Sequence, residues 1–189
     1  MPHRPLRARD LLLPALVIAG AAYCVGRTRR PVGNRRVPQP AKPVDLERYL
    51  GRWYELGRYE AGFEHDCEGV TADYTLREDG VIKVLNTCRA GSPDGPARSS
   101  TGRAKIVPGS GNAKLKVAFF GPFYLGHYWI MDHADDYAWS IVGEPSGTYL
   151  WILHRDPTPA AEVRAELIAR VQELGYDTAL IRPTRQPPG

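Results

Sequence analysis

From residue 44 onward, the chain consists of short apolar segments separated by turn residues. Between residues 70 and 76, apolar and polar side chains alternate with a period of two, which is typical of a strand with one buried face. Asp79 and Gly80 follow, a pair that favours a tight hairpin turn. Further short segments with strand character occupy residues 82–86, 114–119, 127–131, 137–142 and 149–153. This pattern predicts an all-β sandwich or barrel rather than alternating strands and helices.

One segment near the C-terminus has the periodicity of a helix. Thr158 predicts its N-cap, Pro159 its first helical residue and Gly175 its end. The apolar residues of this segment recur three or four positions apart, at Val163, Leu167, Val171 and Leu174. Because a single amphipathic helix has to bury its apolar face, we expect this stripe to pack against the strands rather than to bind a partner. A further short strand is expected at residues 179–182.

The first 43 residues differ in composition from the rest of the chain. Residues 11–25 are mostly apolar, follow several arginines and contain small residues at 19–21, as in a secretory signal peptide. The segment is shorter than the ~20 residues of a membrane span, but the arginines that follow it would also hold an uncleaved anchor at the membrane. The sequence therefore predicts a signal peptide or N-terminal membrane anchor over residues 1–26. It predicts an Arg- and Pro-rich linker without an apolar face over residues 27–43.

Cys24, near the end of the apolar segment, is a candidate lipidation site, as in bacterial lipoproteins. A lipoprotein cleavage site has a small residue immediately before the cysteine and a branched aliphatic residue three positions before it. This chain has Tyr23 and Ala21 at those positions, so it departs from the pattern. The sequence leaves cleavage, anchoring and lipidation at Cys24 open.

Composition and charge exclude several classes of protein. The 189 residues are 43% hydrophobic and 24% charged, which suits one medium-sized domain and is unlike a disordered chain or a coiled coil. The net charge of +4 is unevenly distributed, because residues 1–43 carry +8 and residues 44–189 carry −4. Since the body of the chain lacks a basic stripe that would neutralise phosphates, we do not expect nucleic-acid binding.

Three motifs in the body of the chain follow one another in an order that one protein family shares. The sequence LGRWYE at residues 50–55 contains a G-x-W motif, formed by Gly51 and Trp53. YWIMD at residues 128–132 and LWILHR at residues 150–155 follow, the latter ahead of the predicted helix. Together they resemble the lipocalins, and residues 119–124 are similar to the bacterial outer-membrane branch of that family, which resembles apolipoprotein D. The resemblance covers residues 44–185.

The resemblance implies an eight-stranded up-and-down antiparallel barrel with one C-terminal α-helix packed on its side. Residues 44–185 would form this lipocalin domain, and residues 186–189 a tail. Gly51, Trp53 and Arg155 would be structural residues, with the Arg155 guanidinium lying over the Trp53 indole near the closed end of the barrel.

The alternation within the strands and the strand phase of the family together predict which side chains face the inside of the barrel. An apolar lining with a few polar groups suits one amphipathic ligand. The predicted ligand-binding residues are Val70, Ala72, Tyr74, Ile82, Val84, Asn86, Leu115, Val117, Phe119, Tyr128, Ile130, Tyr149 and Trp151. The sequence also allows the alternative that these side chains fill a small solid core.

The resemblance also implies a function. The chain would bind and carry or store a fatty acid or a lysophospholipid, for maintenance of the bacterial envelope. It would be found in the periplasm or at the outer membrane, with membrane association through the N-terminus, as a monomer or a homodimer and without enzymatic activity. The alternative is an enzyme that acts on a hydrophobic substrate through a cysteine in the barrel.

The state of Cys67 and Cys88 separates these two functions. The turn at residues 77–80 places the two cysteines at nearly opposite positions of the predicted hairpin, so that a bulge or a diagonal pairing would bring them together. This spacing is close to what a disulfide requires. We therefore predict a Cys67–Cys88 disulfide, which would remove the obvious nucleophiles and indicate an oxidising compartment.

No metal or other cofactor is expected from the sequence. The histidines, which show no close metal-binding spacing, are His65, His127, His133 and His154. Residues 60–68, between the first two predicted strands, are rich in charge. We expect them to form a solvated loop over the open end of the barrel, with gating by the apolar Phe63 as the alternative.

Overall fold

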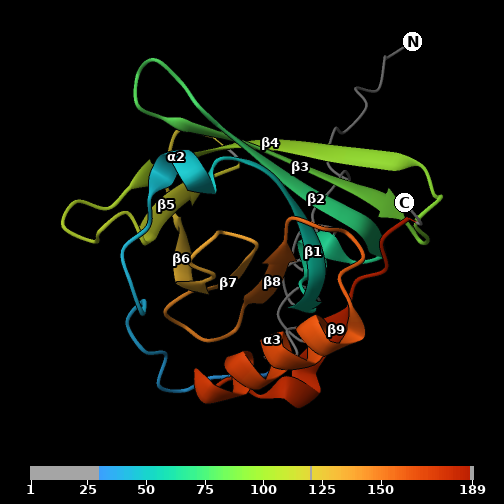
Figure 1. The fold of residues 1–189 in the computed structure, drawn as a ribbon. Coiled ribbons are helices and arrows are strands. Elements are labelled where there is room, and N and C mark those ends of the chain that lie inside the picture. The colour runs from blue at the N-terminus through green and yellow to red at the C-terminus, as the bar shows by residue number, and fades with distance from the viewer. Residues whose placement is uncertain (1–29, 120, 188–189) are drawn as a thin grey trace, which may run out of the picture. The chain divides into compact units, whose positions relative to one another are not determined.

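The computed structural model describes residues 30–119 and 121–187, which include an antiparallel β-barrel with a helix beside it (Figure 1). Its strands are β1 (Gly51–Tyr59), β2 (Cys67–Leu76), β3 (Ile82–Ala90), β4 (Ala97–Ile106), β5 (Lys114–Ala118), β6 (Gly126–His133), β7 (Trp139–Gly143), β8 (Leu150–His154) and β9 (Ile181–Pro183). The helices are α2 (Leu46–Tyr49) and α3 (Ala161–Glu173), with 3-10 turns η1 (Gly62–Glu64) and η2 (Thr178–Leu180).

Each strand from β1 to β8 pairs in antiparallel fashion with the next, and β1 also pairs with β8. This closes an eight-stranded barrel, so the predicted fold class is confirmed. The predicted signal peptide or anchor over residues 1–26, and Cys24 within it, lie outside the described residues.

The two ends of the barrel are built differently. At one end, residues 44–49 run into α2 and are tied to the turns beside them. The backbone N–H of Val44 donates to the Gly111 carbonyl (2.8 Å), and that of Asp45 donates to the Tyr137 hydroxyl (2.7 Å). We term this the closed end. At the other, the open end, residues 60–66 with η1 connect β1 to β2.

The β2–β3 hairpin has the predicted turn at residues 77–80. Gly80 takes a φ of +74°, a left-handed conformation that glycine adopts without steric penalty. Next to the turn, Thr75 pairs with Lys83. Toward the open end, a bulge between Glu68 and Thr71 shifts the register. The hairpin prediction is thus confirmed, and the bulge alters the phase of β2 at its start.

The seam between β1 and β2 has two parts. Near the closed end, residues 51–54 of β1 pair directly with β2. Toward the open end, β9 pairs with β1 instead, and the residues after β9 fill the space up to β2. The Gln186 side-chain amide donates both to the Glu55 carbonyl on β1 (2.7 Å) and to the Val70 carbonyl on β2 (3.0 Å). The C-terminal segment, predicted as a tail from residue 186, therefore forms part of the wall.

Helix α3 packs its apolar stripe on the outside of the barrel, as predicted. Leu167 and Val171 are buried in a cluster that includes strand residues of β1, β6, β7 and β8. Gly175 ends the helix with a φ of +85°, and the N–H of the following Tyr176 donates to the Val171 carbonyl (3.2 Å), the bond of a Schellman cap.

The predicted start of α3 is wrong by two residues. The helix begins at Ala161, with Ala160 rather than Thr158 in the N-cap position. The Asp156 carboxylate accepts the backbone N–H of Thr158 at 2.8 Å, which holds residues 156–158 in a turn of their own. Thr158 therefore belongs to the turn that precedes the helix.

The described part of the predicted linker lies along the barrel. The compact unit begins at Val32, and the Asn34 side chain donates to the Leu174 carbonyl at 3.0 Å. The backbone N–H of Ala41 donates to the Met131 carbonyl at 2.8 Å. These hydrogen bonds and the Val37 side chain, which packs against the outer apolar cluster, hold the segment in place. It has no apolar stripe, so its sequence did not indicate that it packs. Within residues 30–119 and 121–187, no helix is long and apolar enough to cross a membrane.

Candidate ligand-binding site

The floor of the barrel interior is formed by the predicted pair Trp53 and Arg155. Trp53 has no solvent exposure, and the Arg155 guanidinium carbon lies 3.7 Å from the centre of its ring system. Arg155 also donates to the carbonyls of Arg52 (2.6 Å) and Leu50 (2.8 Å). The pair thus joins β8 to the start of β1 at the closed end. The expected contact of the Arg155 guanidinium with the Trp53 indole is present in the structure.

A chain of hydroxyl groups lies just above this floor. Tyr74 donates to the Tyr128 hydroxyl (3.0 Å), and the Tyr49 hydroxyl lies 2.9 Å from that of Tyr128 and 3.0 Å from that of Ser140. Burial raises the pKa of Tyr49 to about 12 and also raises the pKa values of Tyr74 and Tyr128. All three phenols therefore stay protonated and bonded to one another. Tyr49 and Ser140 were not predicted, because neither lies in a clearly alternating segment.

Most of the predicted lining residues do belong to the interior apolar cluster. Those that are buried in it are Tyr74, Ile82, Val84, Leu115 and Ile130. Those that are only partly buried against it are Ala72, Val117, Phe119, Tyr128 and Trp151. An inner-face side chain can be exposed only to the inside of the barrel or to its mouth. These five side chains therefore remain available for contact with a ligand that enters through the mouth.

Asn86 provides a polar group on the same face. It lies opposite Ala72 on β2, and among the described residues its side-chain oxygen is buried without a hydrogen-bond partner. An orphaned buried acceptor of this kind is costly and suits a ligand hydroxyl or a water molecule. Gly102 on β4 leaves space for the Phe119 ring, because a Cβ at this position would lie 2.7 Å from that ring.

Two predicted lining residues lie elsewhere. Val70 belongs to a separate cluster with Cys67 and Cys88, because the bulge in β2 displaces it toward the disulfide. Tyr149 lies at the rim, where its ring stacks on Trp151 (5.8 Å between centroids) and also contacts Phe63 (5.8 Å). The Phe63 side chain is 66% exposed.

Two charged residues of β1 point into the barrel, although strand periodicity would place them on opposite faces. Glu55 lies opposite Leu153 and Arg58 lies opposite Trp151, and both of those partners belong to the interior cluster. Glu55 and Arg58 share the inner face because a bulge between Glu55 and Gly57 inserts one residue into β1. Sequence analysis missed this pair, since a period of two puts residues three apart on opposite sides.

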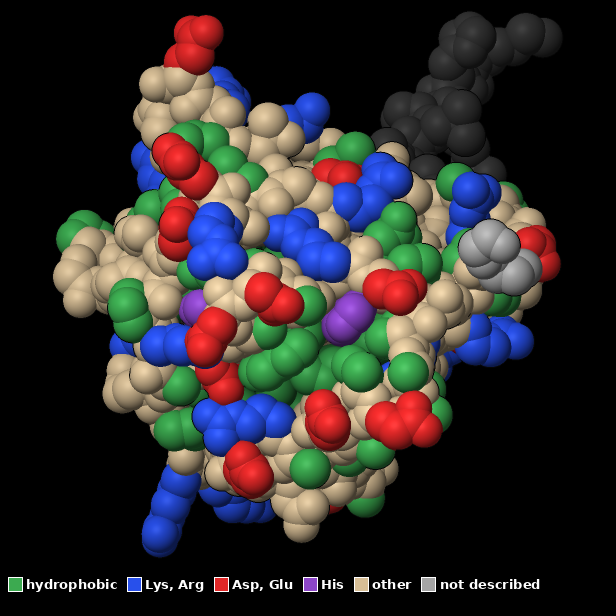
Figure 2. Space-filling view, viewed as in Figure 1, with side chains coloured by type: hydrophobic (Ala, Val, Ile, Leu, Met, Phe, Trp, Pro, Cys, Tyr) green, Lys and Arg blue, Asp and Glu red, His purple; other side chains and the backbone are tan. Residues whose placement is uncertain are grey.

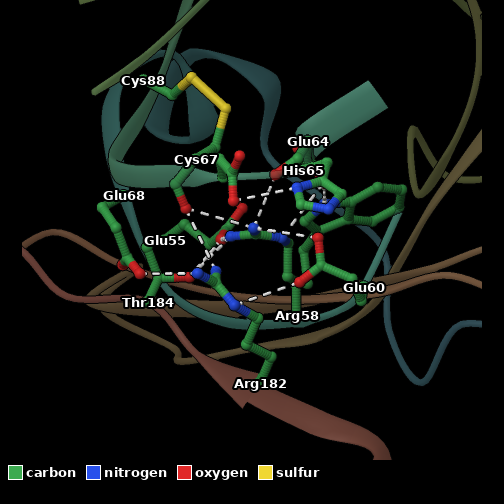
Figure 3. Close-up of a disulfide and its surroundings, with 12 residues drawn as sticks. Glu55, Arg58, Glu60, Glu64, His65, Cys67, Glu68, Cys88, Arg182 and Thr184 are labelled. Atoms are coloured by element: carbon green, nitrogen blue, oxygen red, sulfur yellow. Dashed lines mark hydrogen bonds and ion pairs between the residues drawn. A yellow bond between two sulfur atoms is a disulfide. The ribbon is translucent and has the colours of Figure 1, made fainter. Parts of the chain in front are cut away.

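Arg58 is the centre of a buried polar cluster at the open end (Figure 3). Its Nη1 donates to Glu55 (2.7 Å) and to the Thr184 hydroxyl (3.2 Å), and Thr184 in turn donates to Glu55. Its Nη2 donates to the carbonyls of Glu64 (2.8 Å) and Cys67 (3.2 Å). Arg58 thereby connects β1, the η1 loop, β2 and the C-terminal segment. Burial raises the pKa of Glu55, although Arg58 opposes this effect.

The charged loop at residues 60–68 is only partly solvated, which corrects the sequence prediction. His65 and Asp66 are exposed, but the side chains of Glu64 and Glu68 are 14% and 5% exposed. Glu64 accepts a hydrogen bond from the Trp151 indole at 3.0 Å. Burial and the nearby Glu55 raise the pKa of Glu64 to about 8. These carboxylates are buried because they face arginines that the β1 bulge and β9 bring inside.

The predicted disulfide is present. Cys67 and Cys88 are bonded, with 5.3 Å between their Cα atoms. Cys67 pairs with Ala90 in the ladder, so the bridge runs diagonally to the residue two positions away. Both sulfurs are thus held in a bond at the open end. Within the described residues, no group of three or more metal-ligating side chains is found.

The surface carries charges of both signs. On the face drawn in Figure 2, acidic and basic side chains are interspersed around a central apolar area. This mixture agrees with the small net charge of residues 44–189.

Comparison with known sequences identifies close relatives. The family model described as "Lipocalin-like domain" matches residues 44–186. The chain is 39% identical over 177 residues to "Outer membrane lipoprotein Blc" of Escherichia coli strain K12, covering 93% of this chain and 98% of the relative. It is 37% identical over 160 residues to "Temperature-induced lipocalin-1" of Arabidopsis thaliana, covering 81% and 85% of the two chains. Mouse apolipoprotein D is 39% identical over 122 residues, 62% of this chain and 61% of that protein.

Solved structures share the fold at lower identity. The cockroach allergen Per a 4 superposes with a TM-score of 0.62 at 22% identity, covering 82% of this chain and 96% of the allergen. Lobster apocrustacyanin A1 superposes with a TM-score of 0.58 at 17% identity, covering 84% and 94%. Identities this low establish similarity of the fold alone.

Proposed function

We propose, from the premise that this chain belongs to the lipocalin family, that it binds a fatty acid or a lysophospholipid inside its barrel and carries or stores it in the bacterial envelope. The observation that carries the proposal is the partial exposure of five inner-face side chains. They are Ala72, Val117, Phe119, Tyr128 and Trp151. One acyl chain packed against them would complete the apolar interior.

The energetics allow useful affinity without a covalent step. Burying a sixteen-carbon chain at ~0.8 kcal/mol per CH₂ group yields roughly 12 kcal/mol before costs are subtracted. Association and ordering of the chain cost ~4 to 15 kcal/mol, so the lower end of this cost leaves roughly 8 kcal/mol, which corresponds to micromolar binding.

A binding function is better supported than an enzymatic one. With Cys67 and Cys88 joined in a disulfide, neither sulfur can act as a nucleophile, which argues against the alternative of a cysteine-dependent barrel enzyme.

Location in the bacterial envelope agrees with the relatives from Escherichia coli and Vibrio cholerae, which are named outer membrane lipoproteins. The disulfide agrees with an oxidising compartment such as the periplasm. Attachment through a lipid at Cys24, retention of residues 1–26 as an anchor, and a monomeric or homodimeric state are further parts of this proposal. The mass of the mature chain distinguishes cleavage of residues 1–26, their retention as an anchor and lipidation at Cys24.

Native mass spectrometry tests the proposal directly. The full chain, produced with its leader in a Gram-negative host and purified without organic solvent, should carry a 1:1 ligand in the mass range of a fatty acid or lysophospholipid. Replacing the inner-face Ala72 by Trp should abolish this mass, because the indole would fill the space next to the lining. The matched control is Thr71→Trp, on the outer face of the same strand, which should retain it. A ligand-free wild type that also fails to bind added oleate would contradict the proposal.

A further inference from the structure

One buried guanidinium at the open end has an unused donor. An arginine side chain carries five N–H groups. In Arg58, which has no solvent exposure, the four groups on Nη1 and Nη2 have acceptors in Glu55, Thr184, Glu64 and Cys67. The Nε group has no hydrogen-bond partner within residues 30–119 and 121–187. A buried donor in this state favours any acceptor that can reach it.

The nearest carboxylate does not reach this donor. Oε2 of Glu64 lies 3.8 Å from Arg58 Nε, which is too far for a hydrogen bond. The same oxygen accepts the Trp151 indole N–H at 3.0 Å. Glu64 is also a poor anion in this position, because burial and the nearby Glu55 raise its pKa to about 8. Two N–H donors, from Arg58 and Trp151, therefore converge on a carboxyl group that is mostly neutral at pH 7.

The charges around this position are balanced when Glu64 is neutral. Apart from Glu64, the cluster pairs three carboxylates with three guanidinium groups: Glu55, Glu60 and Glu68 with Arg58, Arg182 and Arg185. An incoming anion would therefore add one negative charge, placed next to the Nε–H of Arg58 that Glu64 does not reach. Figure 3 shows Glu55, Glu60, Glu64, Glu68 and Arg182 around Arg58.

The site next to Arg58 Nε also lies at the open end of the apolar lining, where the head group of a bound lipid would be. Trp151 belongs to the interior cluster and at the same time donates to Glu64. Phe63, the residue before Glu64, covers Tyr149 at the rim and is largely exposed. A lipid whose acyl chain lies along the inner face would thus bring its head group to Arg58 and Trp151, where the η1 loop now lies.

We propose that the anionic head group of the bound lipid takes the place of the Glu64 side chain, accepting hydrogen bonds from Arg58 Nε and Trp151 Nε1 while the Glu64 side chain turns into solvent and its backbone carbonyl keeps its bond to Arg58. The inference rests on the proposed function, because the acyl chain has to occupy the barrel. It makes the protein selective for amphiphiles that carry a carboxylate or a phosphate, and it makes Glu64 an internal competitor of the ligand. Arg58 and Trp151 then determine specificity for the head group.

Three ligands with the same oleoyl chain test this selectivity: oleate, 1-oleoyl-lysophosphatidylglycerol and the uncharged 1-oleoylglycerol. Their affinities for the full chain are measured by titration calorimetry at pH 7. We expect at least one of the two anionic ligands to bind about tenfold more tightly than 1-oleoylglycerol, as one charge-assisted hydrogen bond predicts. Preference for oleate identifies a carboxylate as the head group, and preference for the lysophospholipid identifies a phosphate.

The variant Glu64→Ala tests the competition. Removal of the carboxyl group should tighten binding of the preferred anionic ligand several-fold and leave that of 1-oleoylglycerol unchanged. The matched control is Glu78→Ala, in the exposed β2–β3 turn at the closed end, which should change neither affinity. Arg58 is kept in every variant, because its remaining bonds hold the η1 loop.

The outcomes separate this inference from the proposed function. If charged and uncharged ligands bind equally, or if Glu64→Ala changes all three affinities by the same factor, the head-group site is refuted while lipid binding stands. If none of the three ligands binds, both fail.

Discussion

The closed and open ends of the barrel each contain an arginine beside a tryptophan, but the two pairs differ in how completely their polar atoms are satisfied. At the closed end, Arg155 lies flat on Trp53 and donates to several backbone carbonyls. At the open end, Arg58 has an N–H without a partner in the described part of the chain, and Trp151 donates to a carboxyl group whose pKa is raised by burial. The closed end is built for stability. The open end keeps unused bonding capacity, as ligand sites commonly do at some cost in stability.

The largest effect should come from the floor of the closed end. Replacement of Trp53 by Ala removes a fully buried indole and the surface on which Arg155 lies, so we expect a loss of ~3 to 5 kcal/mol in the free energy of unfolding. Urea denaturation followed by circular dichroism measures it. Trp129→Ala, which removes a half-buried indole from the outer cluster, is the control and should cost less. Equal losses would show that the floor has no special role.

The disulfide should have the next largest effect. Cys67 and Cys88 are 21 positions apart, and a loop of that size corresponds to ~3 kcal/mol of stabilisation. The double variant Cys67→Ser, Cys88→Ser should lose about this amount in urea denaturation and keep the barrel, because the floor is untouched. Complete unfolding of this variant at room temperature would mean that the open end is also essential to the fold.

Loss of Arg155 at the closed end should lower the free energy of unfolding less than loss of the Trp53 ring beneath it. Arg155→Met keeps an apolar side chain over Trp53 but removes the cation and its bonds to the carbonyls. We expect a cost of ~1 to 3 kcal/mol in thermal or urea denaturation. A cost as large as that of Trp53→Ala would contradict the division of roles, because it would assign the stability of the floor to the charge rather than to the buried ring.

The smallest effect is expected at the open end and depends on pH. Because the pKa of Glu64 is raised to about 8 when the η1 loop is closed, the closed loop binds a proton more tightly than the open loop. The stability of the closed loop is therefore complete below about the normal carboxyl pKa of 4.3 and falls as the pH rises toward 8. Because the loop can open by itself when Glu64 ionises, we expect only a small change in the free energy of unfolding of the barrel.

Hydrogen exchange of the amides at residues 60–66 checks this prediction. After correction for intrinsic rates, their protection should decrease between pH 6 and pH 9 in the wild type. Glu64→Gln, which cannot ionise, should show constant protection, and amides of α2 at the closed end should be insensitive to pH in both proteins. A pH-dependent loss of protection that persists in Glu64→Gln would assign the effect to another group.

The sequence predicted the closed end better than the open end, for a physical reason. Trp53 and Arg155 lie in motifs with a regular strand around them, so a period of two and a family pattern suffice to place them. Tyr74, Ile82 and Val84 were placed on the inner face for the same reason. Long, regular strands leave one choice of face, and that choice is visible in the spacing of apolar residues.

At the open end, two bulges break that regularity. One brings Glu55 and Arg58 to the same face, and the other moves Val70 toward the disulfide. A bulge depends on how neighbouring strands pair, so spacing along one strand does not reveal it. The role of Gln186 was equally hidden, because its partners on β1 and β2 lie more than 100 positions away in the sequence.

The seam closed by β9 and Gln186 also has a consequence for biogenesis. The residues that fill it follow all eight barrel strands in the chain, so a growing chain can form its hairpins before it can complete the wall between β1 and β2. Until residues 181–186 have been synthesised, the open-end parts of both strands present free backbone edges, the kind of surface through which nascent proteins aggregate or engage chaperones. Complete closure of the barrel therefore has to wait for this segment, and a premature stop codon before Ile181 would leave that edge permanently open.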